Sequence, residues 1–303
     1  MLVETCNYCI RNIPGTSQVL VAYIVRNTLK QFQKIQPDPS RTVIVCGAPR
    51  SGTTWLTQLL AAATESEIVF EPFAPQANYF AKVKPSVDSL VELETKYKIN
   101  SILTGKSLKL WLAAGNTNLL PKNKYILKTV HGGFLLPYLF EKYANPIILI
   151  ERNPYATVYS QLNSFGGKEY RFLSSLLDNK TITNTWLKPY VSELKRVDNL
   201  VEEYAAVVAI ERYYYKVFMQ KIPHKKVSYE LLVSDTKSQI EQILEWLDMD
   251  FKIRESTLFQ ESFTSFGDKK SLSERIEGWK TKLSKQDKKL IKKWLLIFSL
   301  NDY

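Results

Sequence analysis

The chain has 303 residues, of which 45% are hydrophobic, so it can bury the core of one large α/β domain, and a disordered chain is excluded. Its 41 Lys and Arg against 30 Asp and Glu give a formal charge of +11, which favours anionic partners: a nucleotide, a sulfated or phosphorylated substrate, nucleic acid or an acidic lipid surface. Three cysteines are too few for a disulfide framework.

The first residues, 1–40, are predicted to be a helical extension ahead of the domain. Residues 17–34 contain an apolar run that ends at Arg26 and falls short of the ~20 residues of a membrane span. We predict an amphipathic packing helix, with weak contact to a membrane surface as the alternative. Cys6 and Cys9 lack the second pair of ligands that a structural zinc site needs. We see no secretory signal and expect a cytoplasmic protein.

Four short apolar runs have the pattern of strands that are buried on both faces of a sheet. They are RTVIVCG at 41–47, EIVFEPF at 67–73, KYILKTV at 124–130 and NPIILIE at 145–151. Helical sequence separates them, and such alternation implies a parallel sheet covered by helices on both faces. We therefore predict a three-layer α/β sandwich over residues 41–303, with a strand-loop-helix like that of P-loop proteins.

Periodicity and capping residues place helices between and after these strands. Asn153 and Pro154 form a good N-cap and first-turn pair after the fourth strand. Ser284 and Asp287 resemble a capping box near the C-terminus. The predicted helices cover residues 53–64, 155–165, 198–220, 238–249 and 284–300, and a short fifth strand covers 225–232.

Residues 166–196 are polar and mixed, without a clear period, and we predict an insertion over the site. Basic and aromatic residues are interleaved in it, which suits an acidic or sugar-bearing acceptor whose rings stack on aromatic side chains. Ordinary packing of the aromatic residues is an equal alternative. The residues are Lys168, Arg171, Lys180 and Lys188, with Tyr170, Phe172, Trp186 and Tyr190.

The stretch GAPRSGTT at residues 47–54 has the spacing of a phosphate-binding loop between a predicted strand and a predicted helix. Loop amides and the dipole of the following helix favour an anion there, and the small Ser51 and Gly52 permit its close approach. Thr53 stands where nucleotide triphosphatases carry Lys, the cation is Arg50, and no predicted strand ends in an Asp for Mg²⁺. We expect an anion of lower charge than a metal-bound triphosphate, and no metal requirement.

PRSGTTWL at residues 49–56 resembles the 5′-phosphosulfate loop of sulfotransferases that use 3′-phosphoadenosine 5′-phosphosulfate (PAPS), although cytosolic members have Lys at the position of Arg50. The resemblance implies that the phosphosulfate end of PAPS is bound by Arg50, Ser51, Gly52, Thr53, Thr54 and Trp55.

ERNPYATVYS at residues 151–160 is similar to a second segment of that family, in which an Arg after a strand and a Ser eight residues later bind the donor's 3′-phosphate. The resemblance assigns this role to Arg152 and Ser160. A guanidinium matches phosphate oxygens bidentately and a hydroxyl adds one directional donor. The alternative is an Arg paired with a carboxylate and a Ser exposed on a helix.

Two further stretches extend the resemblance over about residues 41–303. VSYELLV at 227–233 is similar to the family's YEDL segment. RIEGWKTKL at 275–283 looks like a shortened form of its basic, glycine-containing loop, with altered spacing. The resemblance implies that Tyr229, Arg275 and Lys280 contact the 3′-phosphate and adenine side of PAPS.

Sulfuryl transfer to a hydroxyl needs a base and cations at the bridging oxygen. His131 follows the third strand at the carboxyl end, where the crevice of an open α/β sheet lies, and resembles the family's Lys-Thr-His segment with one extra residue. Glu71 precedes Pro72 and resembles the Glu-Pro of carbohydrate sulfotransferases. Both stay candidate bases, with a positioning role as the alternative for each. Lys128 and Arg50 are the candidate cations.

These features predict a PAPS-dependent sulfotransferase that acts, in line and without metal, on a hydroxyl of a carbohydrate, glycolipid or other small-molecule acceptor. The alternatives are a P-loop nucleotide or small-molecule kinase, which the missing loop Lys argues against, and a non-catalytic binder of adenosine bisphosphate. No nucleic-acid motif appears, so we expect no nucleic-acid partner, and we assign no oligomeric state.

Overall fold

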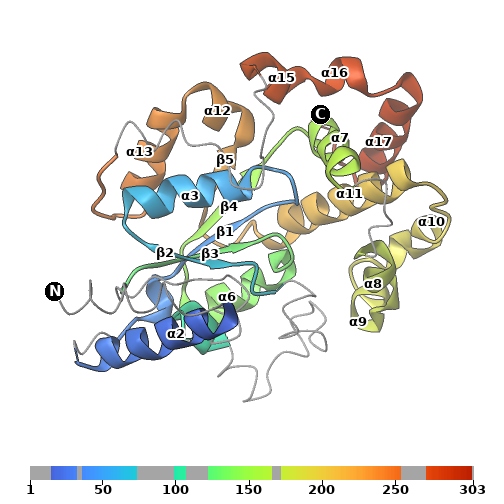
Figure 1. The fold of residues 1–303 in the computed structure, drawn as a ribbon. Coiled ribbons are helices and arrows are strands. Elements are labelled where there is room, and N and C mark those ends of the chain that lie inside the picture. Colours follow the sequence, from blue (N-terminus) through green and yellow to red (C-terminus); the bar gives the residue numbers. More distant parts are fainter. Residues whose placement is uncertain are drawn as a thin grey trace.

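A single parallel sheet of five strands forms the centre of the protein (Figure 1). The computed structural model describes residues 15–32, 36–73, 99–106, 122–165, 172–253 and 271–301. The strand order is β2-β3-β1-β4-β5, and each neighbouring pair is parallel. The strands are β1 (Val43–Cys46), β2 (Glu67–Phe70), β3 (Tyr125–Thr129), β4 (Ile147–Glu151) and β5 (His224–Ser228).

Helices cover both faces of the sheet, as Figure 1 shows. On one side lie α3 (Thr53–Ala63), α12 (Tyr229–Ser234) and α13 (Thr236–Trp246), and on the other α2 (Gly15–Phe32) and α6 (Leu136–Tyr143). Side chains of β1 alternate accordingly: Val43 and Val45 are buried in one hydrophobic core, whereas Ile44 and Cys46 are buried in the second. Because successive side chains of a strand point to opposite faces, a sheet covered twice needs apolar residues at every position. The predicted three-layer α/β sandwich is confirmed.

The principal helices lie close to their predicted ranges. Asn153 caps its helix by accepting from two amides, and Ser284 with Asp287 forms a complete capping box. The main helices are α3 (Thr53–Ala63) and α13 (Thr236–Trp246) on the first core, and α6 (Leu136–Tyr143), α7 (Pro154–Ser164), α11 (Leu200–Phe218) and α17 (Lys285–Ile297) on the second. The smaller ones near the C-terminus are α15 (Leu272–Glu277) and α16 (Trp279–Lys282).

The fifth strand is shorter than predicted, because β5 ends at Ser228 and helix α12 (Tyr229–Ser234) follows at once. The Ser228 hydroxyl accepts from the amide of Leu231 and so caps α12. A serine that caps a helix competes with continuation of the strand.

The segment predicted as an irregular insertion is helical from residue 172 onward. It forms α8 (Phe172–Asp178), α9 (Lys180–Asn184), a 3₁₀ turn (Lys188–Tyr190) and α10 (Val191–Leu194). Leucine and isoleucine side chains from these helices are buried in the second core. The prediction of an aperiodic segment is wrong here, since helices of four to seven residues are too short to display a hydrophobic period. Lys168, Tyr170, Arg171, Cys6 and Cys9 lie outside the described residues.

Helix α2 (Gly15–Phe32) packs against the edge of the sheet through Arg26. The guanidinium is 1% exposed, pairs with Glu67 of β2 and lies 3.5 Å from the Tyr125 hydroxyl of β3. The Tyr23 hydroxyl donates to the carbonyl of Lys106 at 2.7 Å. The predicted packing helix therefore docks by a buried ion pair. Within the described ranges, no helix combines the length and apolarity that crossing a bilayer requires.

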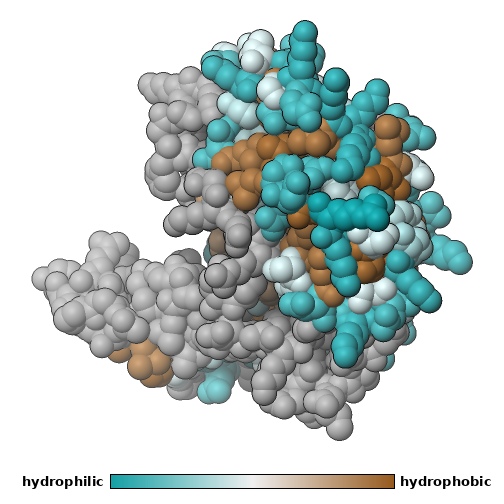
Figure 2. Space-filling model, turned by 90° about the vertical axis from the view of Figure 1, so that its right-hand side faces the viewer, coloured by the Kyte–Doolittle hydropathy of each residue, from teal (hydrophilic) through white to brown (hydrophobic). Residues whose placement is uncertain are grey.

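The surface mixes polar and apolar side chains. Figure 2 shows hydrophilic residues distributed over one face of the molecule with hydrophobic ones between them. On helix α17, Lys285, Lys289 and Lys292 are exposed, whereas Ile291 and Trp294 are buried. This is the usual arrangement of an amphipathic helix with a solvated basic face.

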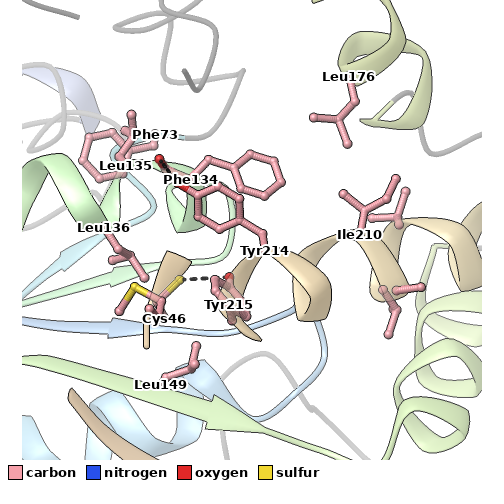
Figure 3. Close-up of a cluster of buried hydrophobic side chains, with 14 of the residues drawn as sticks. Cys46, Phe73, Phe134, Leu135, Leu136, Leu149, Leu176, Ile210, Tyr214 and Tyr215 are labelled. Carbon is pink, nitrogen blue, oxygen red and sulfur yellow. Dashed lines mark hydrogen bonds between the residues drawn. The ribbon is translucent and has the colours of Figure 1, made fainter. Parts of the chain in front are cut away.

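Polar groups are buried in the second core beneath the carboxyl end of β1 (Figure 3). The Cys46 sulfur lies 3.4 Å from the Tyr215 hydroxyl of α11, and burial raises the pKa of Cys46 to about 12. One turn earlier on α11, burial raises the pKa of Glu211 to about 8, against the opposing effect of Arg212. Both Cys46 and Glu211 are therefore neutral near pH 7.

This burial predicts a pH-dependent stability. Between its ordinary pKa of 4.5 and about 8, Glu211 binds a proton in the folded chain but not in the unfolded one, so its contribution to stability falls as pH rises. Glu211→Gln removes this proton linkage. We expect wild type to lose more free energy of unfolding than the variant between pH 5 and pH 8. Urea unfolding at both pH values measures this difference.

The exposed Glu245 of α13 provides the control, because Glu245→Gln should leave that difference the same at both pH values. Parallel stability curves for wild type and Glu211→Gln would contradict the assignment.

Candidate active site

Because all five strands are parallel, their carboxyl ends lie at the same end of the sheet. A predicted site residue follows or ends each strand there. Cys46 of β1 is in register with Thr129 of β3 and Leu149 of β4. The chain runs from β1 to β2 and β3 on one side and then to β4 and β5 on the other, and ligands of such sheets bind where the strand order reverses. In sheet order the residues are Glu71, Lys128 with His131, the loop 47–54, Arg152, and Tyr229.

The loop after β1 has the geometry of an anion site. Gly52 is the N-cap of α3, with φ 97°, and supplies no side chain to the amides of the first turn. A Cβ at Gly52 would lie 2.5 Å from the Tyr229 ring, and one at Gly47 would lie 2.3 Å from the carbonyl of Ile150. Both glycines are therefore required by close packing, and the uncapped helix start favours an anion.

The loop and the segment 151–160 are in direct contact. The Arg50 Nε donates to the Ser160 hydroxyl at 3.3 Å, and the Arg152 Nη1 donates to the main-chain carbonyl of Arg50 at 3.0 Å. Gln161 adds a hydrogen bond from its amide to the carbonyl of Pro49, at 2.9 Å. The structure thus brings the two predicted anchors, about a hundred residues apart in the chain, into one cluster.

Arg152 lies at the centre of this cluster. Its guanidinium lies 4.4 Å from the centroid of the Tyr229 ring, and its Nη2 donates to the carbonyl of Arg275 at 2.8 Å. Burial lowers the pKa of Arg152, and burial together with the nearby Arg152 lowers the pKa of Arg50. Among the described residues neither arginine forms an ion pair with a carboxylate. An anion would therefore relieve two partly desolvated positive charges.

Three buried polar atoms of these segments have no hydrogen-bond partner in the described part of the chain: the Gln161 Oε1 and two donors, the Ser51 hydroxyl and the Arg152 Nε. Buried polar atoms are seldom left unpaired, because each costs about 1–3 kcal/mol. One of the two donors lies on each anchor, so both anchors have a donor available to a ligand.

The C-terminal candidates contribute unequally. Arg275 contacts Arg152 through its main-chain carbonyl. Lys280 is exposed and pairs with Glu277 in its own helical region. Between them, Trp279 stacks on Tyr155 of α7 at 5.0 Å and so fastens this segment beside the cluster.

At the carboxyl ends of β2 and β3, Glu71 and Lys128 form a partly buried ion pair. The Glu71 oxygens also accept from the amide of Val130 at 3.2 and 3.1 Å, and Glu71 has a left-handed φ of 44°. Lys128 is 5% exposed, with its Nζ 4.7 Å from the centroid of the Phe70 ring. A candidate base and a candidate cation thus lie in contact at the ends of β2 and β3.

His131 belongs to the same group. Burial lowers its pKa, Glu71 opposes that effect, and Lys128 adds to it, so the imidazole is neutral at physiological pH. Strand β3 ends at Thr129, whose hydroxyl accepts from the amide of Gly132 at 2.8 Å. Because a turn follows Thr129, strand alternation does not decide the direction of the His131 side chain. Despite the one extra residue between Thr129 and His131, the imidazole lies close enough to Glu71 and Lys128 for both charges to affect its pKa.

Three residues that the sequence analysis did not single out support the cluster. Arg212 of α11 donates to the carbonyl of Arg152. Glu230 of α12 accepts from the amide of Asn153 at 2.8 Å. Gln161 holds the loop, as described above. The pair Glu211-Arg212 within an otherwise apolar helical stretch was the available signal, since charged residues are rarely buried without a partner.

Two aromatic residues of the predicted insertion, Trp186 and Tyr190, pack against the second core. Trp186 lies 5.6 Å from Phe134 and 5.3 Å from Tyr214, between ring centroids. Tyr190 lies 4.2 Å from Phe298 in the same measure. Lys180 and Lys188 are exposed. Trp186 and Tyr190 are therefore packing residues, which was the alternative interpretation of the sequence. Acceptor binding by this segment stays a prediction.

The sequence model of the sulfotransferase domain family matches residues 40–298 of this chain. Similar solved structures include a sulfotransferase domain from the curacin biosynthetic pathway, at 15% identity and a TM-score of 0.48, covering 87% of this chain and 98% of that one. A mouse sulfotransferase in complex with PAP has 15% identity and a TM-score of 0.45, with 87% and 86% covered. Among curated protein sequences, none matches the chain.

The close packing at Gly52 predicts that Gly52→Ala damages the anion site. A left-handed φ in an L-residue costs about 1–2 kcal/mol, and the added methyl meets Tyr229. We expect urea unfolding to show this loss, and the stabilisation that inorganic phosphate gives wild type to disappear. Ala62→Gly on the exposed side of α3 should lose about 1 kcal/mol yet keep the phosphate effect. Retention of that effect in Gly52→Ala would refute the site.

Proposed function

The chain belongs to the sulfotransferase domain family, as its motifs indicated, and we propose that it transfers a sulfuryl group from PAPS to a hydroxyl of a small-molecule or glycan acceptor. The observation that carries this proposal is the contact between the phosphate-binding loop and the Arg152–Ser160 segment. It brings two candidate anion sites together at the carboxyl end of the sheet. PAPS has an anionic group at each end of its ribose, whereas a nucleoside triphosphate has only one anionic chain.

The residues present fit this donor. The loop amides, Arg50 and the Ser51 hydroxyl would hold the phosphosulfate, and Arg152 with Ser160 would hold the 3′-phosphate. The unpaired Ser51 hydroxyl and Arg152 Nε support this division, because one orphan donor lies at each anchor. Thr53, Thr54 and Trp55 would complete the loop side, and the Tyr229 ring packs against the Arg152 guanidinium. Arg275 and Lys280 stay candidates for the adenine side.

PAPS supplies the sulfuryl group and leaves as PAP. The chain's own residues orient the acceptor hydroxyl, take its proton and stabilise charge on the bridging oxygen. Lys128 is the candidate for stabilising that oxygen, because its ammonium is nearly buried. A positive charge attracts a developing negative charge more strongly where water is excluded. Arg50 would share this role from the loop.

The base is Glu71 or His131. A neutral His131 is ready to accept a proton at physiological pH, because burial lowers its pKa. Glu71 is ionically paired to Lys128, so it acts as a base only if Lys128 turns toward the donor. The Glu71-Pro72 pair resembles that of carbohydrate sulfotransferases, and for this reason we propose an alcohol of a carbohydrate, glycolipid or similar molecule as the acceptor.

Donor binding is expected to be independent of metal. Within the described residues, no three His, Cys, Asp or Glu side chains are grouped as metal ligands. PAP at ~100 times its Kd should stabilise the protein by about 2.7 kcal/mol in thermal unfolding with EDTA present. ATP should stabilise it less, with or without Mg²⁺. Stabilisation that requires ATP together with Mg²⁺ would contradict the proposal and favour a kinase.

Variants at the two candidate bases should separate their roles. Removing the base lowers kcat by about 10²–10⁴-fold, because proton transfer contributes that much, while PAP affinity stays within about twofold. If His131 is the base, kcat/KM falls as pH drops through a value below 6.5, and His131→Asn abolishes this limb. If Glu71 is the base, Glu71→Gln instead causes the loss of kcat, and His131→Asn does not. Full activity of both variants would exclude both residues.

A further inference from the structure

We propose that Arg212 of helix α11 is a positioning residue of the donor site, which fixes the peptide group between Arg152 and Asn153 and thereby aims Arg152 at the 3′-phosphate. This inference rests on the proposed function for the identity of the ligand. Its structural basis is a hydrogen bond from the Arg212 Nη2 to the main-chain carbonyl of Arg152. Arg212 is 7% exposed.

The same peptide group is held from its other side. Its N–H, that of Asn153, donates to the Glu230 Oε1 of α12 at 2.8 Å. The second oxygen of Glu230 accepts from the Ser228 hydroxyl at 3.0 Å, which holds the carboxylate in place. Arg212 and Glu230 therefore form a clamp on one peptide plane, with α11 on the carbonyl side and α12 on the amide side.

The clamp acts where strand β4 turns into helix α7. Asn153 caps α7 through its side chain, and its φ of −42° with ψ of 126° makes this peptide group the start of the bend. The direction of the Arg152 side chain follows from the orientation of this peptide. A rotation of the plane would move the guanidinium away from Tyr229 and from the carbonyls of Arg50 and Arg275, which it now contacts.

Three arginines are linked in series by these contacts. Arg212 donates to the carbonyl of Arg152, and Arg152 donates to the carbonyl of Arg50. Arg50 in turn donates to Ser160. The guanidiniums of Arg212 and Arg152 thus each hold the main-chain carbonyl of the next arginine. Helix α11, which the sequence motifs do not include, is in this way connected to the phosphate-binding loop.

A packing role alone does not require a guanidinium at this position. Replacing a whole buried ion pair by apolar side chains of similar volume is often tolerated, whereas removing one buried charge from its partners is destabilising. Arg212 lies in a helix whose neighbours Ala209, Ile210 and Tyr214 are buried. Arg212→Met keeps an apolar side chain of similar length there and removes the donor to the Arg152 carbonyl, and urea unfolding measures the stability that the change costs.

The test compares PAP with 5′-AMP, which differ by the 3′-phosphate. Calorimetry gives the ratio of their Kd values. We expect wild type to prefer PAP strongly, Arg152→Met to lose most of that preference, and Arg212→Met to lower it about tenfold while the Kd of 5′-AMP changes less than about twofold. In an Arg152→Met background, Arg212→Met should have no further effect on the ratio, because the two residues act through one guanidinium.

Arg26→Met is the matched control. It also removes a buried helical arginine, but one that pairs with Glu67 at the far edge of the sheet, so it should lower stability and leave the PAP preference unchanged. Should Arg212→Met fail to fold, Glu230→Ala releases the other side of the same peptide and should lower the preference as well.

The outcomes separate the two proposals. A wild-type protein without preference for PAP over 5′-AMP would overturn the proposed function. A wild type with that preference, lost in Arg152→Met but kept within about twofold in Arg212→Met or in a folded Glu230→Ala, would overturn the clamp alone.

Discussion

The hydrogen bond from Arg152 to the carbonyl of Arg50 joins the two segments of the candidate active site, at the carboxyl end of the sheet. It connects the residue after β4 to the loop after β1, and thus the two sides of the point where the strand order reverses. The Arg152 guanidinium is buried against carbonyls and a tyrosine ring and forms no ion pair in the described part of the chain. The fold therefore presents positive charge at one fixed place, and an anionic ligand is its natural complement.

The two ends of the edge differ in charge balance. After β1 and β4, Arg50 and Arg152 lie together without direct ion pairs among the described residues. Around β2 and β3, Lys128 and Glu71 compensate each other, with the neutral His131 beside them. In the proposed reaction the first end binds the donor's 3′-phosphate and the second performs the proton transfer.

Much of the architecture was predictable because its signals are local. The four apolar runs predicted the strands, since a strand buried on both faces needs apolar side chains throughout. Gly52 predicted the loop, and the close approach of Tyr229 explains the need for glycine. The helices of residues 172–194 were not predictable, because their buried side chains are defined by the core that they contact rather than by their own period. Arg212 and Glu230 were missed for the same reason: each acts through a main-chain group distant in sequence.

The sequence by itself determined the parallel sheet, the strand-loop-helix around the glycine loop, and the family. Hydrophobic period and turn chemistry are properties of neighbouring residues, so they can be recognised along the chain. Only the tertiary structure decided that Arg50 contacts Ser160, that Glu71 pairs with Lys128, and that α11 holds the Arg152 peptide. Those contacts join segments from different strands and helices, and their geometry is fixed only once the two cores have packed around the sheet.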